Sequence, residues 1–410
     1  MAKRLCSAFI LMMLLSGCAS AAVPSDPEAH VVILWHPFTD ARKEALEALS
    51  DRFNTENQDA LTLILEYQSD IYGKITSATP EQWPDLIIIS PEDLASYDEA
   101  GVAVPLPEGG EAMQDLLPIA RALYTTGNTL QAIPLGLTTY VLYYNQDWLR
   151  DLEYDPGSAT LEQLRQAACA ATSAEGKQTG LGISTYPGTF LVFLTAGGFT
   201  PTQAEPNDGT LVQTTTLLQE LLGTSCAEIY EISDEGSAQF SNGTMAMILD
   251  SSLRYHAIEQ AIAVEHNFSP GVASLPGTGA QPASTLWHGP GMMLLSPEGS
   301  RRERAQQVLQ WFLEADVQVA WSQSTGYLPV RRSVVERQVQ GVGLSTIEKD
   351  LFYLLLRAAN EGTWITWPES MNSATCRPAL VRGLIDLSSM KPITEVVSST
   401  LSTCRSTSTP

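Results

Sequence analysis

The chain has 410 residues, of which 46 are acidic and 23 are basic, and its formal net charge at pH 7 is -23. This length exceeds the roughly 250 to 300 residues at which a single hydrophobic core stops growing, so we expect two domains. The negative charge argues against nucleic-acid binding, which depends on neutralising phosphates with Lys and Arg. It argues equally against docking on anionic lipids by charge.

The first residues have the layout of a secretory leader: two basic residues, an apolar run over residues 5–15, and small residues after it. The run is shorter than the roughly 20 apolar residues that span a bilayer. Leu15-Ser16-Gly17-Cys18 resembles the lipobox of bacterial lipoproteins, whose cysteine receives a diacylglyceryl group and becomes the first residue after cleavage. The resemblance implies a signal peptide over residues 1–17 and lipidation of Cys18. A chance cysteine beside an ordinary cleavage site is the alternative.

Residues 18–29 are small, polar and rich in Pro, a composition typical of a flexible tether. No later apolar stretch is long enough for a transmembrane helix. Loss of Lys3 and Arg4 with the leader would change the net charge from -23 to -25. We therefore expect an exported, soluble, acidic body held by lipid at the bacterial cell membrane, on the outer face or in the periplasm.

Four cysteines remain beyond the leader and Cys18. An even number of cysteines in an exported chain indicates disulfides, and their wide spacing matches no zinc motif. We expect Cys169 to pair with Cys226 and Cys376 with Cys404, with isolated buried thiols as the alternative.

Strand and helix patterns alternate in the first part of the body, which indicates βαβ units and a parallel sheet. The predicted strands cover residues 30–38, 61–68 and 84–90, and the predicted helices cover 40–57 and 71–78.

Further elements follow in chain order. Thr160 and Gln163 form a capping box for the helix that they begin. The predicted elements are a strand over 137–144, helices over 160–171, 188–198 and 211–223, strands over 245–249, 268–279 and 292–296, a helix over 301–323, and three or four helices beyond 342.

Several of these segments, in this order, resemble the extracellular solute-binding proteins of ABC importers, the family that includes the maltose and glycerol-phosphate binders. The matching segments are LWHPFTDARKEALEALSDRFN, PDLIIISPEDLASYDEAGVAVPL, IPLGLTTYVLYYNQDWL, FSNGTMAMILDSS and STGYLPVRRSVV. The resemblance implies a two-lobed α/β fold of the periplasmic-binding-protein type, with crossing hinge strands and a ligand cleft between the lobes. We expect lobe 1 to comprise 30–137 and 273–325, and lobe 2 to comprise 138–272 and 326–404.

The carboxyl ends of strands in open α/β sheets are where ligands bind. Three such ends are Trp35-His36, Ser90-Pro91-Glu92 and Asp250-Ser251-Ser252. A sugar site needs aromatic platforms beside polar groups, which Trp35 and His36 could supply. Glu92 matches a family residue that accepts hydrogen bonds from ligand hydroxyls. A core tryptophan, a loop histidine and a helix N-terminal charge are the alternatives.

Hydroxyl side chains stand at two further places in the expected cleft. Thr138 and Thr139 begin the strand that crosses between the lobes, although β-propensity explains them equally well. Ser251 and Ser252 stand where small hydroxyl residues line the site in the family.

Aromatic residues complete the candidates. Tyr72 and Tyr327 match ligand tyrosines of the glycerol-phosphate binders, and Tyr186 stands where family members carry aromatic stackers. Helix packing is the alternative for Tyr72, and it is the better account of nearby Phe190. Arg377 could occupy the place of a phosphate-holding arginine, with a surface arginine as the alternative.

The segment LWHGPGMM combines Trp287 and His288 with Gly289, where a glycine allows close backbone approach to a ligand. A tight turn without a ligand is the alternative.

These observations predict a monomeric substrate-binding lipoprotein that captures a sugar or sugar-like solute and delivers it to the transmembrane subunits of an ABC permease. A binder of glycerol phosphate or a related phosphodiester is the alternative, against which the negative charge weighs. An exported glycoside-acting enzyme is the remote alternative, because no G-x-S-x-G, H-E-x-x-H or P-loop motif occurs. Five scattered histidines argue against a metal site, and we expect no cofactor.

Overall fold

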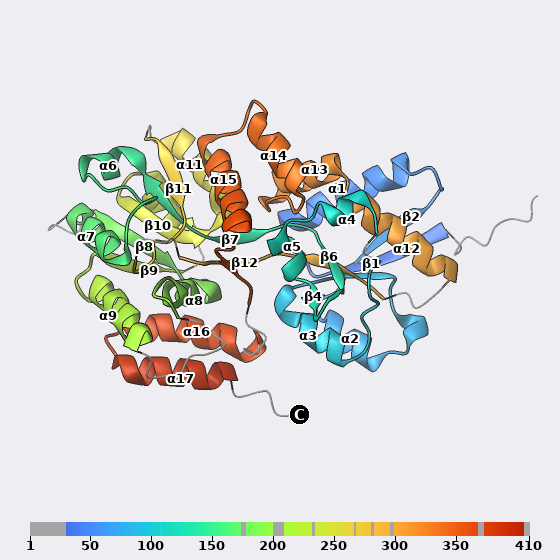
Figure 1. The fold of residues 1–410 in the computed structure, drawn as a ribbon, viewed down its shortest axis with the longest axis horizontal. Helices are drawn as coiled ribbons and strands as arrows, with labels where there is room; N and C mark the ends of the chain where they lie inside the picture. The colour runs from blue at the N-terminus through green and yellow to red at the C-terminus, as the bar shows by residue number, and fades with distance from the viewer. Residues whose placement is uncertain are drawn as a thin grey trace, which may run out of the picture.

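The computed structural model describes residues 30–107, 109–173, 178–199, 209–231, 234–265, 268–279, 283–295, 299–367 and 373–405. The leader, Cys18 and the tether lie outside these residues. Two β-sheets with helices packed around them form two lobes side by side (Figure 1). The predicted two-lobed α/β fold is therefore confirmed. No helix within the described ranges is long and apolar enough to cross a bilayer.

The first lobe contains a five-stranded sheet in the order β2-β1-β3-β13-β6. The first three strands of the chain run parallel, as the alternating pattern predicts, but β13 runs antiparallel to both of its neighbours. The strands are β1 (Val31–His36), β2 (Thr62–Tyr67), β3 (Leu86–Ile89), β6 (Ala132–Pro134) and β13 (Gly291–Leu294), and a separate small ladder joins β4 (Thr125–Thr126) to β5 (Thr129–Leu130).

The second lobe contains a seven-stranded sheet in the order β14-β12-β7-β10-β8-β9, with β11 paired to β7. The strands are β7 (Thr138–Asn145), β8 (Thr179–Ser184), β9 (Ala227–Tyr230), β10 (Met245–Ser251), β11 (Pro270–Ala273), β12 (Thr285–His288) and β14 (Trp364–Ile365).

Helices cover both sheets. Those of the first lobe are α1 (Ala41–Glu56), α2 (Ile71–Ser77), η2 (Pro80–Gln82), η3 (Pro91–Asp93), α3 (Leu94–Glu99), α4 (Glu111–Gln114), α5 (Pro118–Ala122), α12 (Gly299–Phe312), α13 (Ala315–Thr325) and α14 (Arg332–Gln340). Those of the second lobe are α6 (Gln146–Asp151), α7 (Leu161–Ala171), α8 (Pro187–Ala196), α9 (Gly209–Gly223), α10 (Asp234–Ser241), η4 (Ser252–Arg254), α11 (Tyr255–Glu265), α15 (Thr346–Glu361), α16 (Ser373–Ser388) and α17 (Ile393–Arg405).

Strand β7 shows how the core is divided. Successive side chains of a strand point to opposite faces of a sheet. Val141 and Tyr143 belong to a hydrophobic cluster that continues into the first lobe, whereas Tyr140 and Leu142 belong to a second cluster beneath α7, α8, α16 and α17. Strand β7, which forms part of the hinge between the lobes, is thus packed on one face by a hydrophobic core that both lobes share.

The chain crosses between the lobes later than the sequence predicts at two of three places. The first crossing lies between β6 of the first sheet and Thr138, where β7 begins in the second. The second lies at Gly289-Pro290 rather than at 273, because β12 pairs with β7 and β14 in the second sheet. The third follows α14 rather than Gly326, because Arg331 forms an ion pair with Asp115 of the first lobe at 2.9 Å. Residues 273–279 and 283–288 therefore belong to lobe 2, and residues 326–340 belong to lobe 1.

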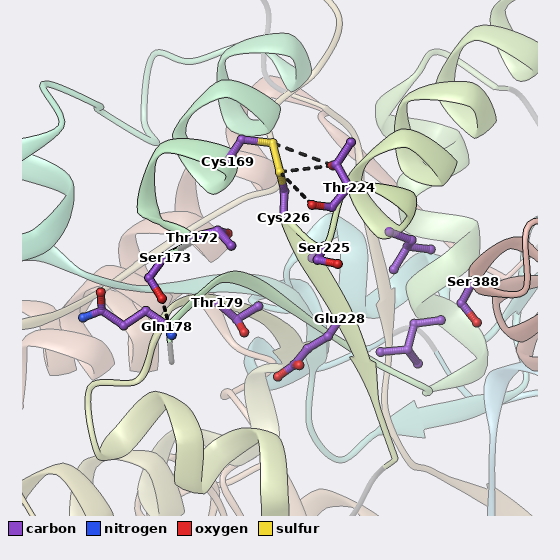
Figure 2. A pocket seen from close by; sticks show the side chains of 13 residues that line it. Cys169, Thr172, Ser173, Gln178, Thr179, Thr224, Ser225, Cys226, Glu228 and Ser388 are labelled. Atoms are coloured by element: carbon purple, nitrogen blue, oxygen red, sulfur yellow. Dashed lines mark hydrogen bonds between the residues drawn. A yellow bond between two sulfur atoms is a disulfide. The ribbon is translucent and has the colours of Figure 1, made fainter. Parts of the chain in front are cut away.

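Two disulfides link elements of the second lobe, in the pairing expected from the sequence. Cys169 of α7 is bonded to Cys226, which precedes β9, and Cys376 of α16 is bonded to Cys404 of α17. Figure 2 shows the first of these at the edge of a surface pocket lined by Thr172, Thr224 and Ser225.

Candidate functional site

A small cavity of about 20 Å³, enough for little more than one water molecule, lies where the two lobes meet. Glu92, which follows β3, enters it from the first lobe. The second lobe contributes side chains from β7, β12 and the helix ends beside them. The lining residues are Glu92, Tyr140, Pro187, Gly188, Leu286, His288, Trp367 and Arg377.

An ion pair crosses this cavity from one lobe to the other. Nη1 of Arg377, in the first turn of α16, lies 2.9 Å from Oε1 of Glu92. The Glu92 side chain is only 7% exposed, whereas that of Arg377 is 47% exposed. A desolvated carboxylate needs hydrogen-bond donors. A solute that separates Glu92 from Arg377 must therefore supply hydrogen-bond donors to the carboxylate and acceptors to the guanidinium.

His288, the last residue of β12, presents a second polar group to the cavity. Its Nε2 atom is buried and has no hydrogen-bond partner within the described residues. Burial and the positive charge of Arg377 lower the pKa of His288 to about 4. The imidazole is therefore neutral at pH 7 and can exchange a hydrogen bond with a ligand hydroxyl without adding charge.

Tyr140 is a cavity residue that the sequence did not single out. Its ring centroid lies 5.7 Å from that of His288 and 6.3 Å from that of Tyr186. Gly188 lies against the same ring, since a Cβ atom there would approach its atoms to 2.3–2.5 Å. The alternation of side chains along a strand could have identified Tyr140, because this residue follows Thr138 by two positions and lies on the same face of β7.

The four hydroxyl residues predicted for the cleft meet at the hinge. Thr138 Oγ1 lies 2.9 Å from Ser252 Oγ and 3.3 Å from Ser251 Oγ. The Thr139 hydroxyl donates to the Leu286 carbonyl at 2.7 Å, and the Thr139 N–H donates to Ser252 Oγ at 3.1 Å. These contacts join β7 to β10 and β12.

Tyr327 is buried behind the cleft, at the junction of three crossing segments. Its ring stacks on Trp321 with centroids 6.1 Å apart and an interplanar angle of 6°. Arg42, at the start of α1, donates from Nη1 to the Tyr327 hydroxyl at 3.3 Å and is paired with Asp40 at 2.6 Å. The sequence did not single out Arg42 or Asp40 for this role.

Strand alternation separates the Trp35-His36 pair. His36 is buried, its Nδ1 has no partner within the described ranges, and its ring centroid lies 6.1 Å from that of Phe38. Trp35 points to the other side of β1, where its Nε1 donates to Glu66 at 2.7 Å. Consecutive residues of a strand cannot share a face, so the two do not form one platform.

Other predicted residues lie away from the cavity lining. Tyr72 is 42% exposed and packs edge-to-face on Tyr97. Trp287 is fully buried and donates from Nε1 to Thr285 Oγ1 at 2.6 Å. The close approach at Gly289 is to the protein backbone, since a Cβ atom there would lie 2.0 Å from the carbonyl oxygen of Gly136.

A buried carboxylate stands directly behind the hinge serines. Burial raises the pKa of Asp250 to about 6, although hydrogen bonds favour its ionised form. Ser251 N–H donates to it at 2.6 Å and the Tyr230 hydroxyl at 2.9 Å. These bonds fix the end of β10, from which Ser251 and Ser252 reach the hinge.

A family model of bacterial extracellular solute-binding proteins matches residues 48–343. The chain belongs to this family. The match includes most strands of both sheets and the first two crossings, and it ends before α15, α16 and α17.

Two of the similar curated proteins are sn-glycerol-3-phosphate-binding periplasmic proteins. That of Pectobacterium atrosepticum is 24% identical in an alignment 375 residues long, which covers 83% of this chain and 81% of the relative. That of Yersinia pestis is 22% identical in an alignment 330 residues long, which covers 74% of each protein. These relatives are binding proteins rather than enzymes.

Solved structures share the fold. The GacH receptor of Streptomyces glaucescens, determined unliganded and with acarbose, matches with a TM-score of 0.71 and 18% identity over 90% of this chain and 96% of its own. The cyclic α-maltosyl-1,6-maltose-binding protein of Arthrobacter globiformis matches with a TM-score of 0.71 and 16% identity, over 92% and 98% of the two chains. At this identity the likeness extends to the fold alone.

Proposed function

We propose that this solute-binding protein captures a small polyol phosphate, of the glycerol phosphate type, between its lobes and delivers it to an ABC permease. The observation that carries the proposal is the Glu92–Arg377 ion pair at 2.9 Å across the cavity. A polyol phosphate carries hydroxyl groups that suit the Glu92 carboxylate and a phosphate that suits the Arg377 guanidinium. Its phosphate takes the place of the carboxylate on the Arg377 guanidinium, a geometry in which Arg binds bidentately.

The hydroxyl end of such a ligand would meet the remaining polar groups. Glu92 accepts hydrogen bonds from the diol, and the unpartnered Nε2 of His288 supplies one more contact. Because the ligand bonds groups of both lobes, it binds the closed state more tightly than an open one and shifts the population towards closure. The names of the two curated relatives support the same ligand class.

An unphosphorylated sugar is the second candidate. The tyrosine pair Tyr140 and Tyr186 offers apolar ring surface beside the cavity, and sugars present weakly apolar faces to such rings. The net charge of -23 also opposes the approach of an anion. The names of the two solved structures, which mention acarbose and a maltosyl sugar, favour this alternative.

The test is isothermal titration of the purified chain with glycerol 3-phosphate, glycerophosphodiesters, glycerol and neutral sugars. We expect glycerol 3-phosphate to bind and glycerol not to bind. Arg377→Gln should weaken phosphate-ligand affinity about 10- to 100-fold, the usual effect of losing a charged hydrogen bond. Arg382→Gln, on the exposed face of the same helix, makes the same charge change and should leave affinity within twofold. Binding of a neutral sugar with no response to glycerol 3-phosphate would favour the second candidate.

We also propose that the chain acts as a monomer on a lipid anchor at Cys18, with the permease as its partner at the membrane. The lipobox-like segment and the flexible composition of residues 18–29 support the anchor. The extracellular family to which the chain belongs is consistent with export.

A further inference from the structure

Arg377 lies in a helical turn that a proline separates from the rest of its helix. Pro378 stands inside α16, directly after Arg377. Proline has no N–H, so the hydrogen bond from residue 378 to the carbonyl of residue 374 is missing, and the ring crowds that carbonyl. The backbone therefore holds the first turn of α16 less firmly than a regular helix would.

A disulfide ties this same turn to another helix. Cys376, directly before Arg377, is bonded to Cys404 in the last turn of α17, and both sulfur residues are fully buried. The two helices pack along each other at the outer side of the second lobe (Figure 1). The crosslink thus holds the first turn of α16 against the last turn of α17.

The geometry of the helix connects this anchor with the direction of Arg377. The buried residues Cys376, Leu380, Leu384 and Leu387 follow at intervals of four, four and three, which is one face of an α-helix. The next residue along the chain is rotated by about 100° from that face. With Cys376 fixed in the core, Arg377 is directed to the lobe boundary, where it meets Glu92.

We propose that the Cys376–Cys404 disulfide is a positioning device for Arg377 and makes solute affinity depend on the oxidation state of this cysteine pair. This inference rests on the proposed function, because it assigns Arg377 to the ligand. The second disulfide offers a matched control. It lies in the same lobe, between α7 and β9, and Figure 2 shows it at a surface pocket whose lining includes no residue of the lobe boundary.

The experiment compares Cys376→Ser/Cys404→Ser with Cys169→Ser/Cys226→Ser. Affinity for glycerol 3-phosphate is measured by titration calorimetry at a temperature where both variants are folded. We expect the first variant to lose affinity about 5- to 20-fold and the second to stay within twofold of the unmodified chain. Pro378→Ala, which returns the missing N–H, should restore most of the affinity in the first variant.

Two further measurements separate positioning from general loosening of the lobe. In the Arg377→Gln background, removal of Cys376 and Cys404 should cause no additional loss, because the group that they position is gone. Hydrogen exchange over residues 373–379 should accelerate in the first variant and not in the second. This readout needs no ligand.

The results test the proposed function and the positioning role of the disulfide separately. Absence of any glycerol 3-phosphate binding by the unmodified chain would overturn the proposed function, while the exchange measurement would still test the anchor. Unchanged affinity without Cys376–Cys404, or an equal loss in the Arg377→Gln background, would overturn the positioning role. If the first variant does not fold, Cys376→Ala/Cys404→Ala, which places no hydroxyl groups in the core, is measured in its place and should show the same loss of affinity.

Discussion

His288 is a polar group in the cavity that the protein keeps without charge. Burial and the neighbouring guanidinium of Arg377 lower its pKa to about 4, so an imidazolium does not compete with Arg377 for Glu92 at neutral pH. Its buried Nε2 remains available for a ligand. A neutral histidine, a carboxylate and a guanidinium together offer one site both hydrogen-bond acceptors and donors.

The lowered pKa of His288 predicts a dependence of stability on pH. An exposed histidine has a pKa of about 6.5, so between that value and about 4 the unfolded chain binds more protons at this position than the folded chain. The contribution of neutral His288 is complete above about pH 6.5 and is lost as the pH falls towards 4. Asp250, whose pKa burial raises to about 6, acts in the opposite direction.

We therefore expect His288→Gln to flatten the acid side of the stability curve. Thermal midpoints measured from pH 7 to pH 4.5 should fall less in the variant than in the unmodified chain. His30→Gln, at a position before β1, is the control and should follow the unmodified curve. Parallel curves for all three proteins would show that His288 is not desolvated.

At the scale of elements, the hinge is built from crossing segments that leave no room for side chains. Gly289 has a φ of 155°, and a Cβ atom there would lie 2.0 Å from the Gly136 carbonyl oxygen. A Cβ atom at Gly136 would lie 2.5 Å from Cβ of Tyr327. The segment before β7, the turn between β12 and β13, and the residues after α13 therefore pack backbone against backbone.

Gly136→Ala should push the Tyr327 ring out of its stack on Trp321. Overpacking of this kind costs about 1–3 kcal/mol of unfolding free energy, and we expect a lower denaturation midpoint together with weaker ligand binding, because the hinge determines how the lobes meet. Gly109→Ala is the control, since a Cβ atom there contacts nothing within 4 Å. Equal stability of the two variants in urea titrations would contradict the close packing at the hinge.

At the scale of the whole molecule, the acidic charge bears on how the protein could be held at a membrane. If the proposed leader is removed with Lys3 and Arg4, the body carries a net charge of -25 and gains nothing from anionic lipid head groups. A lipid on Cys18 would hold it at the membrane without electrostatic help, because two acyl chains supply the two signals that stable anchoring needs.

Cys18→Ala should therefore abolish membrane association. Fractionation of expressing cells, with palmitate labelling as a second readout, should move the chain from the membrane fraction to the soluble or unprocessed fraction. Cys6→Ala, within the leader, is the control and should leave the distribution unchanged. A labelled, membrane-bound Cys18→Ala protein would contradict the lipobox reading.

Local patterns in the sequence were enough for much of the fold. The runs around β1, α1 and β3 predicted those elements, and Thr160 with Gln163 forms the expected capping box at α7. These signals are local, because hydrophobic periods and caps act within one turn or one strand. The predicted helix over 301–323, however, is divided at Leu313-Glu314 into α12 and α13.

The candidate site was predictable only in part. Resemblance to a family directed attention to Glu92 and Arg377, and the glycine-flanked segment LWHGPGMM directed attention to His288; all three line the cavity. The same segment also directed attention to Trp287, which lies in the core. Tyr140 was missed although the strand period relates it to Thr138, and Arg42 was missed because nothing in its own neighbourhood in the sequence marks it.

The sequence by itself determined the class of most elements and the acidic charge, and it predicted a lipobox-like leader, because each of these depends on residues read singly or at short spacing. It also predicted the cysteine pairs, but the fold decided them, since their members lie 57 and 28 residues apart. Only the tertiary structure decided that β12 joins the second sheet, that Glu92 meets Arg377 from the other lobe, and that His288 is neutral at pH 7. All three depend on how distant segments pack: strand pairing, the desolvation of His288, and an ion pair whose two residues lie 285 positions apart in the chain. No local pattern encodes such contacts.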